Sequence, residues 1–154
     1  MGIGSIVSGN VFAGGSSLSI APSGSTSLAR TALSNEQLIF KAADIADRRS
    51  SLLGHVAGTK KHSYAEQLLR RYQRRYGDRG LEFEQSFSAG TRANYGDRGS
   101  IRADVFDFSN NKVYDWKFGS ATLNQTRANH LRQNLPASVK NVIGYNPRFG
   151  STVY

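Results

Sequence analysis

The sequence predicts a mixed domain, α/β (α+β), in which helices pack on a sheet. Apolar residues recur at helical spacing in three segments, 34–58, 63–76 and 120–135. Residues that favour strands occupy two further segments, 81–87 and 139–145, and form an expected hairpin at 101–117. The predicted order is therefore helix, strand, strand, strand, helix, strand, with an extra N-terminal helix in front and a tail after 146.

The composition indicates a soluble domain with a polyanionic partner. A chain of 154 residues suffices for one sizeable core, and its formal net charge of +9 favours nucleic acid. A membrane surface fits less well, because no lysine-rich amphipathic helix stands out. No run approaches the roughly 20 apolar residues of a membrane span. Cysteine is absent, which excludes disulfides and thiolate chemistry, and the three histidines lack zinc-site spacing.

Residues 1–33 are rich in glycine and serine and are expected to form a flexible leader or linker. They lack the basic start of a signal peptide, since Arg30 is the first charged residue. The folded domain is expected over 34–154, with its core at 63–146. Ser34 and Gln37 form a capping box, which marks the start of the first helix.

The expected hairpin at 101–117 carries the most informative residues. Its polar turn is the Ser-Asn-Asn segment at 109–111. A loop of the first two turn residues places Asp104 opposite Asp115, whereas a loop of the last two places it opposite Lys117. Either register puts all three side chains on one face, because side chains alternate along a strand.

Two carboxylates so placed repel each other. At about 5 Å and an effective dielectric of about 20, the repulsion is roughly 3 kcal/mol. Lys117 offsets part of it, and a divalent cation would offset more, because Mg²⁺ binds one or two carboxylates together with water and phosphate. The alternative is a surface hairpin with one Asp–Lys pair and a second, unpaired Asp.

Asp104, ten intervening residues and then Asp115-Trp116-Lys117 resemble the D-xn-(D/E)-x-K signature of the PD-(D/E)XK nuclease superfamily. The predicted order of elements also resembles the restriction-endonuclease-like α-β-β-β-α-β core of that family. The resemblance implies a metal-dependent nuclease: Asp104, Asp115 and the Trp116 carbonyl would bind Mg²⁺ or Mn²⁺, and Lys117 would position the attacking water. Ala103 replaces the proline of the family name, and Asp115 stands where glutamate is commoner.

Glu66 has two explanations. Ser63-x-x-Glu66 reads as a capping box at the start of the second helix. In the resembled family, however, the helix before the sheet often adds a glutamate to the metal site, and Glu66 holds the matching place. Glu82 and Glu84 share one face of the strand at 81–87, where a solvated position is expected.

Basic and polar residues around this core are the expected nucleic-acid contacts. The helix at 63–76 is rich in arginine, and the resemblance favours a glutamine or basic residue on the helix at 120–135. The predicted contacts are Arg70, Arg71, Arg74, Arg75, Arg102, Gln125 and Arg127.

A glycine-rich leader before a compact nuclease core also resembles toxin domains of bacterial polymorphic and secreted effectors. The resemblance implies a domain kept in the producer's cytoplasm, delivered by a secretion system and neutralised by a cognate immunity protein. Restriction, repair and phage-processing roles are left open beside it. DNA is the expected substrate, with RNA left open. The alternative class is a non-catalytic nucleic-acid-binding module of the same fold, and a structural or phage-assembly protein is a third.

Overall fold

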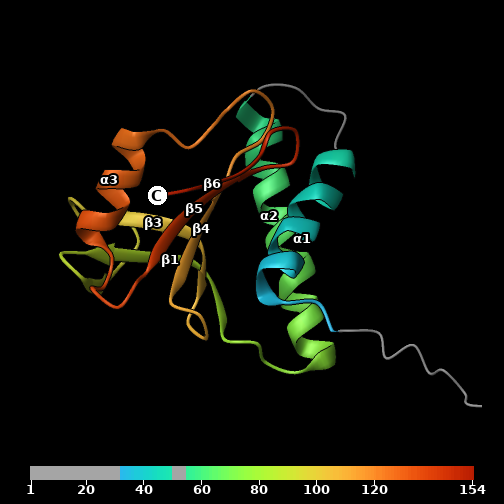
Figure 1. Ribbon diagram of the computed structural model, residues 1–154, viewed down its shortest axis with the longest axis horizontal. Helices are drawn as coiled ribbons and strands as arrows, with labels where there is room; N and C mark the ends of the chain where they lie inside the picture. The colour runs from blue at the N-terminus through green and yellow to red at the C-terminus, as the bar shows by residue number, and fades with distance from the viewer. Residues whose placement is uncertain (1–31, 50–54) are drawn as a thin grey trace, which may run out of the picture. The chain divides into compact units, whose positions relative to one another are not determined.

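The computed structural model describes residues 32–49 and 55–154, so the predicted leader lies outside the described residues except for its last two positions. Over the described part the chain forms three helices and one mixed six-stranded sheet (Figure 1). The elements are α1 Asn35–Arg49, α2 His55–Tyr76, β1 Leu81–Ser88, β2 Thr91–Ala93, β3 Ile101–Asp107, β4 Lys112–Trp116, α3 Gln125–Asn134, β5 Asn141–Asn146 and β6 Gly150–Val153.

The strands lie in the order β2-β1-β3-β4-β5-β6. All neighbours are antiparallel except β4 and β5, which are parallel and are joined through α3. A mixed α+β fold is therefore confirmed. The sequence analysis missed β2, and its expectation of a tail after residue 146 is wrong, because β6 pairs with β5. β6 is exposed along its whole length, so no alternation of apolar residues marks it.

Two apolar layers hold the helices on the sheet (Figure 1). Beneath α1 and α2 lie buried side chains that include Phe83, Val105, Tyr114, Trp116 and Ile143. Beneath α3 lie Phe87, Ala103, Phe106, Val113 and Val142, together with the buried leucines of the α3 region. Neighbours on one strand, such as Val113 and Tyr114, thus face opposite layers, as the pleat requires.

The alternation is broken at one level of the sheet. Phe83 and Phe87 are four residues apart in β1 but belong to opposite layers, and so do Ala103 and Val105 in β3. An even spacing should keep two side chains on one face. The change in β1 coincides with Glu84, whose backbone φ of 56° is left-handed. Both strands therefore exchange the layers that their alternating side chains face, at the level of Glu84.

The start of α2 differs from the prediction. The second helix begins at His55 and not at Ser63, and α1 ends at Arg49. The sequence analysis expected the first helix to end near residues 54–58, whereas Gly58 lies inside α2, where a glycine costs only about 1 kcal/mol relative to alanine. The capping box that opens α1 is confirmed: Ser34 N–H donates to Gln37 Oε1 at 2.9 Å, and Gln37 N–H donates to Ser34 Oγ at 3.2 Å.

α3 and β5 are shorter than predicted. Asn124 is the N-cap of α3, since its side chain accepts the Arg127 N–H at 2.8 Å. The helix therefore begins at Gln125 and not at Ser120. Leu123 precedes the helix and packs in the layer beneath it. β5 begins at Asn141, two residues after the predicted start.

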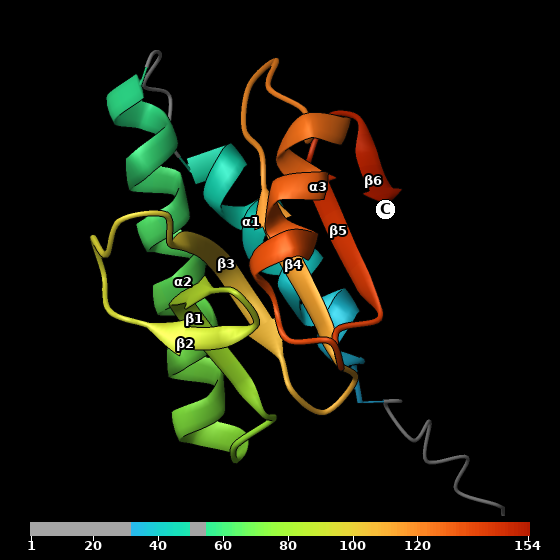
Figure 2. The same cartoon turned by 90° about the vertical axis from the view of Figure 1, so that its left-hand side faces the viewer.

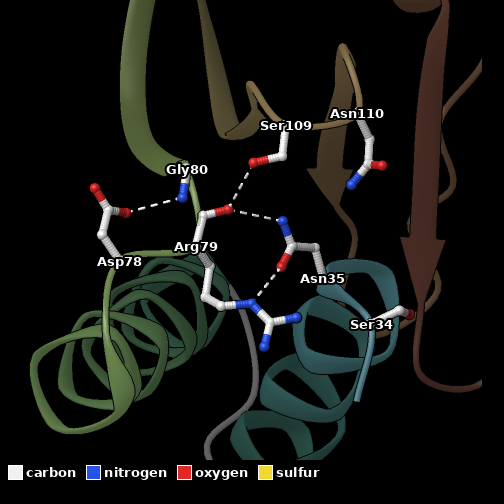
Figure 3. Close-up of a pocket in the computed structure, with 7 residues that line it drawn as sticks. All are labelled: Ser34, Asn35, Asp78, Arg79, Gly80, Ser109 and Asn110. Atoms are coloured by element: carbon white, nitrogen blue, oxygen red, sulfur yellow. Dashed lines mark hydrogen bonds between the residues drawn. The ribbon is translucent and has the colours of Figure 1, made fainter. Parts of the chain in front are cut away.

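An open pocket of about 530 Å³ lies at the turn end of the β3–β4 hairpin (Figure 3). The Asn35 side chain donates to the Arg79 carbonyl at 2.9 Å and accepts from Arg79 Nε at 3.0 Å. Ser109 donates to the same carbonyl, and Asn35 also donates to the buried Asp107 at 3.0 Å. These groups bond mainly to one another, so we assign the pocket a structural role: it joins α1 to the hairpin turn.

Candidate active site

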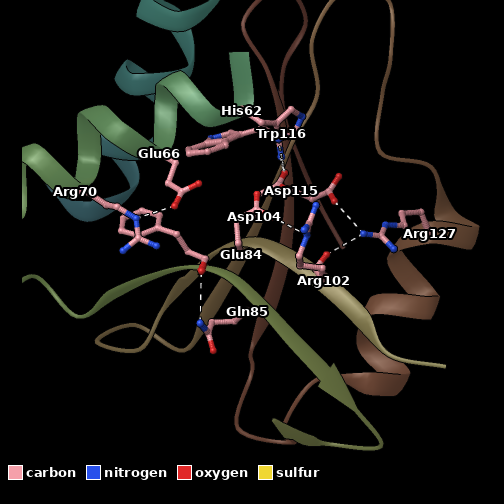
Figure 4. Close-up of polar contacts among 11 residues, drawn as sticks. His62, Glu66, Arg70, Glu84, Gln85, Arg102, Asp104, Asp115, Trp116 and Arg127 are labelled. Carbon is pink, nitrogen blue, oxygen red and sulfur yellow. Dashed lines mark hydrogen bonds and ion pairs between the residues drawn. The ribbon is translucent and has the colours of Figure 1, made fainter. Parts of the chain in front are cut away.

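Four acidic side chains come together at the end of the β3–β4 hairpin that is opposite its turn (Figure 4). They are Glu66 of α2, Glu84 of β1, Asp104 of β3 and Asp115 of β4, and we call them the carboxylate cluster. Their charges are close enough to act on each other: Asp104 raises the pKa of both Asp115 and Glu84, after burial.

The hairpin register follows the first of the two predicted alternatives. Val105 faces Tyr114 and Asp107 faces Lys112, an offset that continues to Asp104 opposite Asp115. The ladder of paired residues stops just before that point. There Asp104 Oδ2 accepts the Trp116 N–H at 2.6 Å. A carboxylate thus takes the place of a backbone acceptor where the two strands part.

Asp115 is a buried carboxylate held by two cations. Tyr114 and Trp116 face α1 and α2, so Asp115 between them faces α3. Its side chain is 2% exposed, its Oδ2 contacts the Lys117 ammonium, and its Oδ1 lies 3.6 Å from Arg127 Nη2. Burial and the Asp104 charge raise the pKa of Asp115 more than these cations lower it. Asp115 therefore contacts Lys117 and lies close enough to Asp104 for the Asp104 charge to raise its pKa.

His62, which the sequence analysis did not select, lies on Asp104. Its Nδ1 is 3.3 Å from Asp104 Oδ2, and its ring packs edge-on against Trp116 and Phe118. Burial lowers the pKa of His62, but the hydrogen bond and charge of Asp104 outweigh burial, so the pKa is raised above 6.5. A signal existed: on a helix through residues 55–76, His62 and Glu66 are one turn apart on the same face.

Glu66 lies well inside α2, so the Ser63 capping box is wrong. A residue in the middle of a helix has no unpaired first-turn N–H groups to cap. Glu66 Oε1 instead accepts from Arg70 Nε at 2.7 Å, one turn on. The Arg70 guanidinium in turn lies 4.8 Å from the centre of the Phe83 ring, over the sheet. Of the two explanations for Glu66, the structure excludes the one in which it caps the helix.

Glu84 also belongs to the cluster, against the expectation of a solvated face. It lies between the pairs Phe83–Val105 and Gln85–Ala103, and so faces Asp104. Its Oε2 accepts from Arg102 Nε at 2.6 Å. Burial and then Asp104 raise its pKa.

The predicted nucleic-acid contacts divide into two groups. Arg102 and Arg127 lie at the cluster, where Arg127 Nη2 donates to the Arg102 carbonyl at 3.0 Å, and Arg70 reaches it through Glu66. The others are outside it. Arg71, Arg74 and Arg75 are exposed further along α2, and Gln125 donates to Asn129 at 2.8 Å.

The cluster suits a cation that keeps most of its water. Among the described residues, no group of three or more His, Asp or Glu side chains converges as metal ligands. Mg²⁺ needs fewer, because it often binds through one or two carboxylates plus water and phosphate. Asp104 and Asp115 supply hard oxygen atoms. Burial and then the Asp104 charge raise the pKa of Asp115, and a bound cation would offset the second of these two effects. The residues present therefore fit Mg²⁺ or Mn²⁺ held by two carboxylates.

A scan against family models and searches of curated proteins and of solved structures each found no match. Within the described ranges, no helix has both the length and the apolar character needed to cross a bilayer.

Proposed function

We propose that this chain is a metal-dependent nuclease of the PD-(D/E)XK type that hydrolyses phosphodiester bonds, with DNA as its expected substrate. The observation that carries the proposal is the meeting of Asp104, Asp115 and Lys117 at the end of the β3–β4 ladder. If the short strand β2 is set aside, the order α2, β1, β3, β4, α3, β5 also supports a restriction-endonuclease-like core.

In this proposal Asp104 and Asp115 hold the Mg²⁺ or Mn²⁺, with the Trp116 carbonyl and Glu66 as further candidate ligands. A bound divalent cation lowers the pKa of water and neutralises charge on a phosphoryl group. His62 and the Trp116 N–H fix the Asp104 carboxylate in place.

Lys117 has a different role from the acids. Its ammonium contacts Asp115 and is partly exposed, so it can orient a water molecule beside the carboxylates. Its backbone N–H donates to the Tyr145 carbonyl at 2.8 Å, which fixes the lysine against β5. In the same proposal, Arg102 and Arg127 contact phosphates of the bound nucleic acid.

The biological setting is part of the same proposal. The glycine-rich segment before a compact basic domain favours a toxin domain of a bacterial effector, with an immunity protein as its partner. Neutralisation by such a protein would be tested by co-purification and by loss of activity in the complex.

The nuclease proposal is tested with supercoiled plasmid DNA and with RNA, each with Mg²⁺ and with EDTA. We expect nicking or shortening with Mg²⁺ only. Binding that is equal in both conditions, without cleavage of either substrate, would instead identify a non-catalytic nucleic-acid-binding module. Neither binding nor cleavage would favour a structural protein.

A further inference from the structure

Tyr95 presents an open aromatic ring close to the carboxylate cluster. It lies on the loop between β2 and β3, which protrudes from the sheet (Figure 2), and it is 81% exposed. The Arg102 guanidinium lies 4.9 Å from the centre of its ring. One face of the ring is therefore backed by a cation, while the rest of it is open to a ligand.

The loop that carries Tyr95 is held by its own hydrogen bonds. The Asn94 N–H donates to the Asp97 side chain at 2.8 Å. The Ser100 N–H and hydroxyl donate to the Asp97 carbonyl at 3.0 and 2.8 Å. A ring on an ordered turn loses less conformational entropy when it binds a ligand.

Arg102 connects this ring to the cluster. The same guanidinium that lies over Tyr95 is bonded to Glu84, which faces Asp104. Arg102 and Asp104 are also two residues apart on β3, about 7 Å along a strand. A ligand on Tyr95 would thus lie next to the atoms proposed to cleave the phosphodiester bond.

We propose that Tyr95 is a base-stacking residue that makes this protein select unpaired, single-stranded nucleic acid. The inference rests on the proposed nuclease function and names its substrate class. Every base has a π-face that can stack on an aromatic ring, and a guanidinium adds a cation–π contribution. Bases within a duplex are already stacked on both faces, so only an unpaired or terminal base can occupy Tyr95. The net charge of +9 supplies attraction to the phosphates without regard to sequence.

The test uses a single-stranded DNA oligonucleotide that contains 2-aminopurine, whose fluorescence is quenched by stacking, and a duplex of the same sequence. Binding is measured in EDTA, which prevents metal-dependent cleavage. The variants are Tyr95→Ala, Tyr95→Phe and the matched control Tyr76→Ala. Tyr76 is 65% exposed and has Arg75 5.7 Å from its ring centre, but it lies at the far end of α2.

We expect the wild type and Tyr95→Phe to quench the single strand equally, because both keep the ring. Tyr95→Ala should abolish quenching and weaken single-strand binding about five- to a hundredfold, the range expected for one stacked base. Tyr76→Ala should behave as the wild type, and duplex binding should be the same in every variant. Single-strand binding by Tyr95→Ala that matches the wild type, or an equal loss on single strand and duplex, would overturn the inference.

The two proposals fail separately. A wild-type protein that quenches through Tyr95 but does not cleave with Mg²⁺ keeps the stacking site and loses the nuclease. One that cleaves with Mg²⁺ but shows no dependence on Tyr95 keeps the nuclease and loses the stacking site.

Discussion

Glu84 of β1 faces Asp104 of β3 across an antiparallel ladder, and Glu84 holds a left-handed backbone at this position, with φ at 56°. That conformation costs a residue with a side chain about 1–2 kcal/mol. Strain of this kind persists only where the surrounding structure holds it, and it occurs often at functional sites. The strained backbone of Glu84 lies where Glu84 and Asp104 come together and where the side-chain alternation of β1 and β3 is broken.

The strain predicts an unusual order of stability. Glu84→Gly should be more stable than Glu84→Ala by about 1 kcal/mol, because glycine adopts a positive φ without steric cost. Gln85 is the control, since its φ is not positive, and there glycine should be less stable than alanine by about 0.5–1 kcal/mol. Urea unfolding midpoints of the four variants give the comparison. The same order at both positions would show that Glu84 stores no strain.

Asp104→Ala and Lys117→Ala should each abolish cleavage while leaving the protein folded. Asp104 is a proposed ligand, and loss of a charge-stabilising group such as Lys117 lowers turnover by a factor on the order of a hundred or more. Lys112→Ala is the control, because Lys112 lies at the other end of β4 from Lys117 and pairs with Glu36 at 3.0 Å, outside the cluster. Plasmid cleavage and circular dichroism are measured together. Full activity in a folded Asp104 or Lys117 variant would refute the assigned site.

Glu66→Gln separates a role at the site from a role in the helix. We expect turnover at limiting Mg²⁺ to fall, because a negative charge is lost from the cluster. The melting temperature should hardly change, since an exposed i,i+4 ion pair contributes only about 0.3–0.5 kcal/mol. Glu82→Gln is the control: Glu82 pairs with Arg92 at 2.8 Å but does not belong to the cluster. Equal turnover of Glu66→Gln and wild type at every Mg²⁺ concentration would leave Glu66 with its Arg70 pair alone.

Asp115→Asn should stabilise the metal-free protein at pH 7. Burial and Asp104 raise the pKa of Asp115 above 3.8, so its ionised form costs folding free energy at every pH above that raised pKa. Below about pH 3.8 the carboxyl is protonated in both the folded and unfolded states, and the cost disappears. The stability difference between variant and wild type should therefore shrink as the pH falls toward 4. Denaturant unfolding in EDTA across this range measures it, and a variant less stable than wild type at pH 7 would contradict the prediction.

Binding to nucleic acid should be steeply salt-dependent. Each phosphate contact contributes about −0.9 to the slope of log affinity against log salt concentration for duplex DNA. Replacing the exposed Arg71, Arg74 or Arg75 by alanine should therefore reduce the slope by about 1 for each residue that contacts a phosphate. Fluorescence anisotropy between about 50 and 200 mM salt gives the slopes. An affinity independent of salt would show that the positive charge serves another purpose.

The central hairpin could be predicted because its information is local. The turn residues limit the register to two choices, and both bring Asp104 close to Asp115 across the hairpin. Alternation alone does not fix where the two side chains point, because it is broken between Ala103 and Val105. The remainder of the cluster is set by contacts distant in sequence. Glu84 belongs to the cluster through a left-handed backbone that its residue type does not predict. His62 was missed because α2 begins eight residues before the predicted start, which makes His62 part of the helix. Gly58 was a misleading signal, because a glycine often follows the end of a helix, whereas here it lies inside α2.

Gly144 affects the charges around Asp115 although it lies on a different strand. It pairs with Asp115 across the β4–β5 ladder, and a Cβ atom there would lie 2.5 Å from the Leu123 Cβ. Leu123 is joined directly to the cap of α3, and the first turn of α3 carries Arg127 toward Asp115. We therefore predict that Gly144→Ala displaces Leu123 and, with it, the first turn of α3, so that the position of Arg127 relative to Asp115 changes. The absence of a side chain at Gly144 thus influences the electrostatics of Asp115 indirectly, through the position of Leu123 and the start of α3.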